Sequence, residues 1–258
     1  MSDLRLFNLK TNKILDKQRY DKQSIRKLIE SNLDELIGIK LIALDYQITT
    51  NPFDAIEVLG YDENYQLVVI EYRVGKFTST INKGLFFLDY LKNNPSKVKI
   101  LLNEKLGYEI SNQINITPRL ISIGDDYNQY DQYAIQKIPF SIDLVKYQIF
   151  DKNLLLLEKN FHSKKIVINN HPFQIENEDD YNLYKVISEF ILSLGDEVCE
   201  VHQGNFIAYR KIKNFIYLMY DHGIELKLKM KTYKTIKIKT IKGFEKAQRD
   251  IETCYDEN

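Results

Sequence analysis

The sequence predicts an α/β protein with a second, small α+β domain, and three observations carry this prediction. Apolar stripes at helical spacing alternate with short β-branched runs from residue 21 to about residue 158. A stretch rich in Asn and acids, residues 159–180, interrupts this pattern. A new helical stripe followed by alternating strands begins at residue 181. We therefore expect domains at 1–158 and 181–258, joined by a linker at 159–180.

The first domain is expected to mix helices and strands. Residues 21–37 place their apolar side chains on one helical stripe that stops at Gly38, and residues 79–92 form a second helix. Strands are expected at 39–48, 53–60, 66–73, 98–102, 119–123 and 141–149, with an apolar run at 154–157. Residues 61–65 carry turn chemistry, so the strands on either side of them form a hairpin.

The second domain is expected to be smaller and to hold one sheet. Residues 181–195 form a helix that stops at Gly195. Short strands follow at 206–210 and 214–220, a long alternating strand at 224–240, and a last helix at 243–254.

Composition excludes several classes of protein. Lys and Arg number 36, as do Asp and Glu, so the formal net charge is zero and a globally basic coat protein is excluded. Cys199 and Cys254 are too few for a disulfide framework, and we expect both thiols to be reduced and inert. No window approaches the roughly 18 apolar residues of a membrane span, and the charged first ten residues lack a secretion signal. A cytoplasmic protein is expected.

Charge is unevenly distributed along the chain. Residues 210–249 hold twelve Lys or Arg against three Asp or Glu, a net of +9. Such a block can hold a polyanion such as nucleic acid. Alternating lysines can equally keep an edge strand from pairing with other chains. The candidate nucleic-acid-binding residues are Lys227, Lys229, Lys231, Lys234, Lys237 and Lys239.

The predicted hairpin concentrates acids on one face. A turn centred on Asn64 makes the indices of facing residues sum to 128, which places Glu57 opposite Glu71 at about 5 Å between Cα atoms. Arg73 shares this face because side chains alternate along a strand. Two facing carboxylates in a buried strand repel and are costly unless paired or liganded. Mg²⁺ or Mn²⁺ bound by both would resolve this, and so would a structural ion pair with Arg73.

At these residues the sequence resembles the PD-(D/E)xK, or restriction-endonuclease-like, nuclease superfamily. IEVLGYDENYQLVVIEYR, residues 56–73, is similar to the family's acid strand, turn and Glu-x-Lys strand. LIESNLDELIG, residues 28–38, resembles the helix whose Glu supports the metal site. The likeness covers about residues 20–123. Residues 178–258 resemble a small module fused behind such domains, on the strength of LGDEV and FIAYRKIKNFIYL within 194–218.

The resemblance implies a site and a function. Glu57 and Glu71 would hold Mg²⁺ or Mn²⁺, Glu30 would assist, and Arg73 would stabilise the phosphate. Lys83, in INKGLFFLDYL, stands where the family often has Gln, and would position the water or simply remain solvated.

Three departures bear on activity. Glu57 stands where the family usually has Asp. Arg73 stands where it usually has Lys, and this change matters because arginine, unlike lysine, cannot act as a base. Lys83 is the third departure. The function expected is a nuclease that cleaves DNA in restriction, phage–host conflict or repair, with dimers common among related enzymes. A catalytically inactive relative that binds nucleic acid, or a protein-interaction module such as an inhibitor or adaptor, is the alternative.

Overall fold

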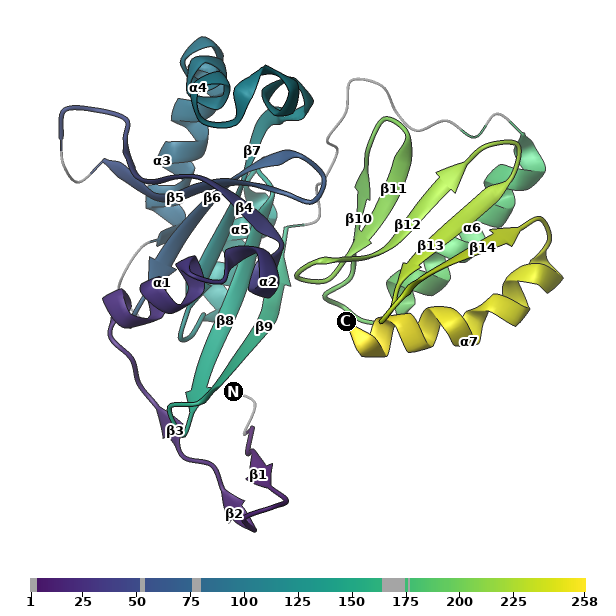
Figure 1. The fold of residues 1–258 in the computed structure, drawn as a ribbon, viewed down its shortest axis with the longest axis horizontal. Coiled ribbons are helices and arrows are strands. Elements are labelled where there is room, and N and C mark those ends of the chain that lie inside the picture. The colour runs from purple at the N-terminus through teal and green to yellow at the C-terminus, as the bar shows by residue number, and fades with distance from the viewer. Residues whose placement is uncertain (1–3, 52–53, 76–79, 164–174, 176) are drawn as a thin grey trace.

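Two packed bodies of helix and sheet make up the computed structural model, which describes residues 4–51, 54–75, 80–163, 175 and 177–258 (Figure 1). The first body is built on a seven-stranded mixed sheet and the second on a five-stranded antiparallel sheet. This confirms the α/β class and a mixed sheet flanked by helices. Residues 159–162, expected in the linker, belong to a strand of the first sheet, and most of the remaining linker lies outside the described residues.

The first sheet has the order β3-β8-β7-β6-β5-β4, with β9 paired to β8. Only β6–β7 and β7–β8 are parallel among its pairs. The strands are β3 (Lys17–Gln18), β4 (Ile39–Gln47), β5 (Ala55–Asp62), β6 (Gln66–Arg73), β7 (Asn115–Gly124), β8 (Ile142–Phe150) and β9 (Leu154–His162). Every residue of β6 is buried, as expected of a central strand covered on both faces.

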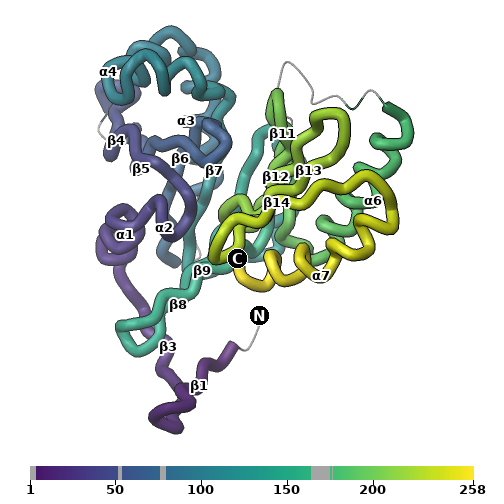
Figure 2. The backbone as a smooth tube through the Cα atoms, turned by 45° about the vertical axis from the view of Figure 1, so that its right-hand side comes forward, coloured from purple at the N-terminus to yellow at the C-terminus, as the bar shows by residue number. Residues whose placement is uncertain are grey.

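Helices cover both faces of this sheet. α1 (Lys22–Glu30) and α2 (Leu33–Ile37) pack on the face that carries Val58, Val68 and Ile70. α3 (Thr80–Asn93), α4 (Pro95–Gln113) and α5 (Gln129–Lys137) pack on the other, where Leu59, Val69 and their neighbours point. α1 and α2 lie apart from α4 in both views (Figures 1 and 2). Side chains at odd positions of β5 and β6 therefore face α3.

Two expectations for the first domain need correction, and one small sheet is an addition. Residues 98–102, expected as a strand, lie in α4, where Val98, Leu101 and Leu102 pack into the core at helical spacing. The expected helix at 21–37 is two helices, because the chain turns at Ser31 and Asn32 between α1 and α2. A small sheet of β1 (Phe7–Asn8) and β2 (Lys13–Ile14) was not expected.

The second sheet runs β10-β11-β12-β13-β14, and α6 (Glu178–Ser193) and α7 (Ile241–Glu257) lie on one face of it (Figure 1). Its strands are β10 (Cys199–His202), β11 (Phe206–Arg210), β12 (Asn214–Tyr220), β13 (Ile224–Lys229) and β14 (Tyr233–Ile238). β10 was not expected. The long strand expected at 224–240 is the hairpin of β13 and β14, whose facing residues include Lys229 and Tyr233.

The turn of the first domain's hairpin docks against the second domain. Asn64 and Asn214 exchange side-chain hydrogen bonds of 2.7 and 3.3 Å. Glu63 accepts from the backbone N–H of Asn214 at 2.7 Å and from Lys229 Nζ at 2.9 Å. Lys213 Nζ donates to the carbonyls of Asp34 and Glu35 in α2. The acid-rich turn that the sequence marked is thus also an interdomain contact.

Gly84 sets how closely α3 approaches the first sheet. A Cβ atom at this position would lie 2.4 Å from Leu120 Cδ2 and 2.6 Å from Cδ1, inside a packed core. We expect Gly84→Ala to lower the free energy of unfolding by about 1–3 kcal/mol, because overpacking outweighs the better helix propensity of alanine.

Gly243→Ala in α7 is the matched control, since its Cβ atom would meet only Thr240 Oγ1, at 3.5 Å. Urea denaturation followed by circular dichroism measures both variants. Equal stability of the two would contradict a tight contact between α3 and β7.

Candidate functional site

The β5–β6 hairpin brings Glu57 and Glu71 together. Val58 faces Ile70 and Leu59 faces Val69, so the indices sum to 128 as the sequence predicted. The Glu57 N–H donates to Glu71 Oε1 at 3.1 Å, and the Tyr72 N–H donates to Glu57 Oε2 at 3.1 Å. Each carboxylate therefore accepts a hydrogen bond from the backbone of the opposite strand. Glu71 is fully buried and Glu57 is 6% exposed.

Two lysines approach this pair of acids. Lys83 Nζ, from α3, lies 2.9 Å from Glu71 Oε2 and 3.5 Å from Glu57 Oε1. Lys22 Nζ, from the first residue of α1, lies 2.5 Å from Glu57 Oε1. Lys83 is also held over the ring of Phe87 at 5.1 Å, which follows from the helix face they share. The sequence singled out Lys83 but missed Lys22, which has no motif to mark it.

The electrostatics of the pair centre on Glu71. Burial and the neighbouring charge of Glu57 raise the pKa of Glu71 from 4.5 to about 7, although Lys83 acts to lower it. Glu71 Oε2 is buried and accepts no hydrogen bond from the described residues, so the ammonium of Lys83 compensates it as an ion pair. A carboxylate in this state gains from any cation that comes closer.

Glu30 lies beside the pair but is engaged elsewhere. Arg26 Nε donates to Glu30 Oε1 at 2.5 Å, and the rest of the guanidinium binds Asp45 through two bonds of 2.8 and 2.9 Å. Burial raises the pKa of Glu30, and Arg26 opposes that shift. Arg26 Nη2 also donates to the backbone carbonyl of Glu57 at 3.3 Å, so Glu30 supports the site through Arg26.

Arg73 is held at the end of β6 by α5. Its Nη1 donates to Asp131 Oδ2 at 2.8 Å, and its Nε donates to the carbonyl of Gly75 at 3.1 Å. The guanidinium also lies 5.3 Å from the centre of the Tyr127 ring. The ion pair expected for Arg73 with Glu57 or Glu71 therefore has a different partner, Asp131. Asp131 is itself fixed by the capping box that starts α5 at Asn128.

The acid pair meets at one cation, the ammonium of Lys83. This ammonium lies 2.9 Å from an oxygen of Glu71 and 3.5 Å from an oxygen of Glu57. Mg²⁺ is commonly held by one or two carboxylates, with water and phosphate oxygens completing its shell. Within the described ranges, no group of three or more His, Cys, Asp or Glu side chains is arranged around a metal position.

The six candidate lysines of the second domain do not form one free surface. Lys227, Lys229 and Lys237 alternate on the face of the second sheet away from α6 and α7. Lys229 pairs with Glu63 at 2.9 Å, and Lys237 pairs with Glu225 at 3.6 Å. Lys234 binds Asp250 of α7 at 2.6 Å, and Lys231 lies in the turn after β13. Several of these charges are therefore already balanced.

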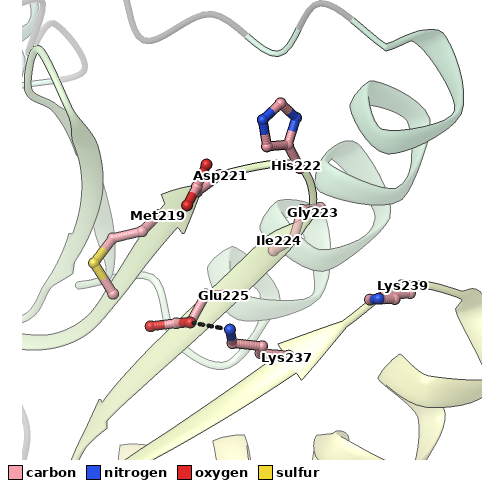
Figure 3. A pocket seen from close by; sticks show the side chains of 8 residues that line it. All are labelled: Met219, Asp221, His222, Gly223, Ile224, Glu225, Lys237 and Lys239. Carbon is pink, nitrogen blue, oxygen red and sulfur yellow. Dashed lines mark ion pairs between the residues drawn. The ribbon is translucent and has the colours of Figure 1, made fainter.

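A pocket of about 380 Å³ opens at the β12–β13 turn and includes two of these lysines, Lys237 and Lys239 (Figure 3). Asp221, His222 and Glu225 line it as well. Figure 3 shows the pair formed by Glu225 and Lys237 across two strands. The mixed charge of its walls does not favour a polyanion over other ligands.

A buried charge cluster joins the two domains, and nothing in the sequence marked it. Arg119 binds Asp62 at 3.0 Å and Asp143 at 2.6 Å. Arg210, from the second domain, reaches the same two acids at 3.1 and 3.5 Å, and Lys159 Nζ lies 3.6 Å from Asp143. These cations hold the pKa of Asp143 well below its usual range, against the raising effect of burial. Such a set is formed by residues far apart in sequence, so no local pattern reveals it.

No protein-family model, curated protein or solved structure matches the chain. Among the helices that the structure describes, none has both the length and the apolar character needed to cross a membrane.

Proposed function

We propose that the protein is a metal-dependent nuclease that cleaves phosphodiester bonds in DNA, on a restriction-endonuclease-like core. The observation that carries this proposal is the meeting of Glu57 and Glu71 from adjacent strands with Lys83 from the following helix. The order of these groups along the chain agrees with the resemblance to the PD-(D/E)xK superfamily. The mixed sheet with helices on both faces is compatible with that fold.

Each residue has a role in this proposal. Glu57 and Glu71 would hold Mg²⁺ or Mn²⁺, which supplies an activated water and stabilises charge on the phosphate. Lys83, on α3, would replace the lysine of the family motif. It would orient the water or the phosphate once the metal ion compensates the charge of the two acids. Arg73 cannot serve as a base, and its role would be to stabilise charge on the phosphate from its position beside Asp131. Glu30 positions Arg26 under the backbone of Glu57.

The alternative is a catalytically inactive nuclease-like protein that binds nucleic acid or a protein partner. The observation in its favour is that lysines already compensate both acids, Lys22 at Glu57 and Lys83 at Glu71. A purely structural ion cluster needs no metal. The lysines at positions 227, 229, 231, 234, 237 and 239 would then supply the binding surface, with the acid pairs given above reducing its charge.

A cleavage assay decides between these functions. Plasmid, single-stranded DNA and RNA are incubated with the full chain and Mg²⁺ or Mn²⁺, and again with EDTA. We expect cleavage of DNA that EDTA abolishes. Retention of DNA without cleavage, weakening steeply as salt rises, would support the inactive binder. If the protein neither cleaves nor retains DNA, the protein-interaction module is the function that remains.

Lys83 can be tested separately from the acids. We expect Lys83→Met to slow DNA cleavage by about 100-fold or more, the scale of a lost positioned acid–base or charge-stabilising group. It also removes a cation that lowers the pKa of Glu71, so that pKa should rise above about 7.

Lys92→Met is the matched control, because Lys92 lies on the same helix and over an aromatic ring, Phe140, at 5.7 Å. Cleavage rates and the pH dependence of stability measure both changes. Equal cleavage rates for the two variants would show that Lys83 has no role in cleavage.

A further inference from the structure

The interdomain charge cluster holds more buried cations than carboxylates. Arg119, Arg210 and Lys159 supply three positive charges, and Asp62 and Asp143 supply two negative ones. All five side chains are less than a tenth exposed. An excess buried charge is costly, so the third cation needs a further partner or must lose its charge.

Cys199 is a further side chain in contact with this third cation. Lys159 Nζ, on β9 of the first domain, lies 3.3 Å from Cys199 Sγ, on β10 of the second. Both are buried, and each has further contacts that hold it in place. Lys159 Nζ donates to the carbonyl of Lys211 at 3.1 Å, and Cys199 Sγ lies 3.4 Å from the carbonyl of Arg210. The amine and the thiol therefore face each other across the domain boundary.

The surroundings of this pair show a second irregularity and a nearby pocket. Arg210 Nε is buried without a hydrogen bond to any described residue, beside Cys199. A pocket of about 370 Å³ is lined by Lys159, Lys211 and Glu197 among others, so water and a small gas molecule can come close to this part of the domain boundary. The side chain of Lys159 is itself buried.

We propose that Lys159 and Cys199 form a covalent N–O–S bridge, with molecular oxygen as the oxidant. The ammonium first gives one proton to water in the pocket. The amine, the thiol and one O₂ then form the N–O–S link and one water molecule. One oxygen atom enters the bridge, and the other takes the S–H hydrogen and one N–H hydrogen. Sulfur and nitrogen each lose two electrons, which reduces the O₂. The reaction resembles other condensations of oxidised cysteine with nitrogen.

The bridge would also settle the charge imbalance. A nitrogen bonded to oxygen is far less basic than an alkylamine, so bridged Lys159 is neutral. Two guanidinium groups, of Arg119 and Arg210, would then face two carboxylates, of Asp62 and Asp143. The link would join the two domains covalently, and it would form only in the presence of oxidant. This proposal does not depend on the nuclease proposal.

Mass spectrometry of the full chain tests the bridge. Protein purified without oxygen and with dithiothreitol is compared with protein exposed to oxygen. We expect a gain of one oxygen and a loss of two hydrogens, reversed by dithiothreitol, and a linked peptide that contains Lys159 and Cys199. Unfolded in the absence of reductant, oxidised protein should show one reactive thiol out of its two cysteines.

Two variants complete the design. Lys159→Arg keeps the charge and should abolish the mass change, while Cys254→Ser should leave it intact, because Cys254 lies in the second domain's own core. Two free thiols after exposure to oxygen would overturn the proposal. So would a gain of oxygen without loss of hydrogen, or a link between other residues. If Lys159→Arg does not fold, peptide mapping of the unaltered chain still decides.

Discussion

Replacing Glu71 by glutamine is expected to abolish DNA cleavage and, above neutral pH, to make the fold more stable. The loss of activity should exceed about 100-fold, since an amide offers no charge to a divalent cation or to the transition state. The gain in stability has a separate cause, the buried charge of Glu71. The two effects together distinguish a functional acid from a structural one, because a structural ion pair would lose stability when one partner is neutralised.

The sign of the stability effect follows from the pKa of Glu71. In the folded protein this pKa is raised from 4.5 to about 7. The folded state therefore binds more protons than the unfolded state between these values, and its stability falls as pH rises through that window. Ionised Glu71 costs about 3 kcal/mol at pH 8 relative to the protonated form. Glu71→Gln should recover a large part of this at pH 8 and little at pH 4.

Urea denaturation at several pH values and cleavage of plasmid measure the two effects. Asp54→Asn is the control, because Asp54 directly precedes β5, the strand paired with that of Glu71, but accepts a hydrogen bond from Thr49 Oγ1 at 2.7 Å. It should alter neither cleavage nor the pH dependence. A Glu71→Gln protein that still cleaves DNA would end the proposed role of the acid pair. A Glu71→Gln protein that is less stable at pH 8 would show that the ion pair between Lys83 and ionised Glu71 stabilises the fold.

Replacing Arg210 by methionine is expected to lower the free energy of unfolding by about 1–3 kcal/mol, because Asp62 and Asp143 each lose one of their two buried arginine partners while Arg119 still binds them. Arg210 is fully buried and binds both Asp62 and Asp143 from the other domain. Burial alone would lower the pKa of its guanidinium, but Cys199 and the two aspartates raise it above the ordinary value. The guanidinium is therefore charged whenever the domains are docked.

Denaturation followed by circular dichroism should show the loss, and the two domains should unfold in separate steps. Lys242→Met, at an exposed position near the start of α7, is the control and should change stability by less than about 1 kcal/mol. The double variant Arg210→Met with Asp62→Asn should recover part of the loss, because it removes the charge of an acid that has lost one of its two arginine partners. A change below about 1 kcal/mol for Arg210→Met alone would mean that the cluster does not hold the domains together.

The local pattern of apolar and polar residues was enough to predict much of the fold. The helices α3, α6 and α7 and the strands β4, β5, β6 and β8 were expected within a few residues of their bounds. The turn at 61–65 predicted the hairpin register, because side chains alternate and facing indices have a constant sum.

The failures have equally local causes. Val98 to Leu102 is an apolar run that suits either a strand or a buried helix, and only packing against the first sheet decides for α4. Residues 224–240 keep their alternation through the turn at 230–232, which has none of the usual turn residues.

By itself the sequence determined the pairing of Glu57 with Glu71, since a hairpin's geometry depends on its own residues. The tertiary structure alone decided what surrounds them: Lys22 from α1, Arg26 near Glu30, and Asp131 as the partner of Arg73. It alone also assembled Asp62, Arg119, Asp143, Lys159 and Arg210 between the domains. The physical reason is that charge compensation depends on distance in space. Residues far apart in the chain meet only when helices and sheets pack, and no periodicity records those meetings.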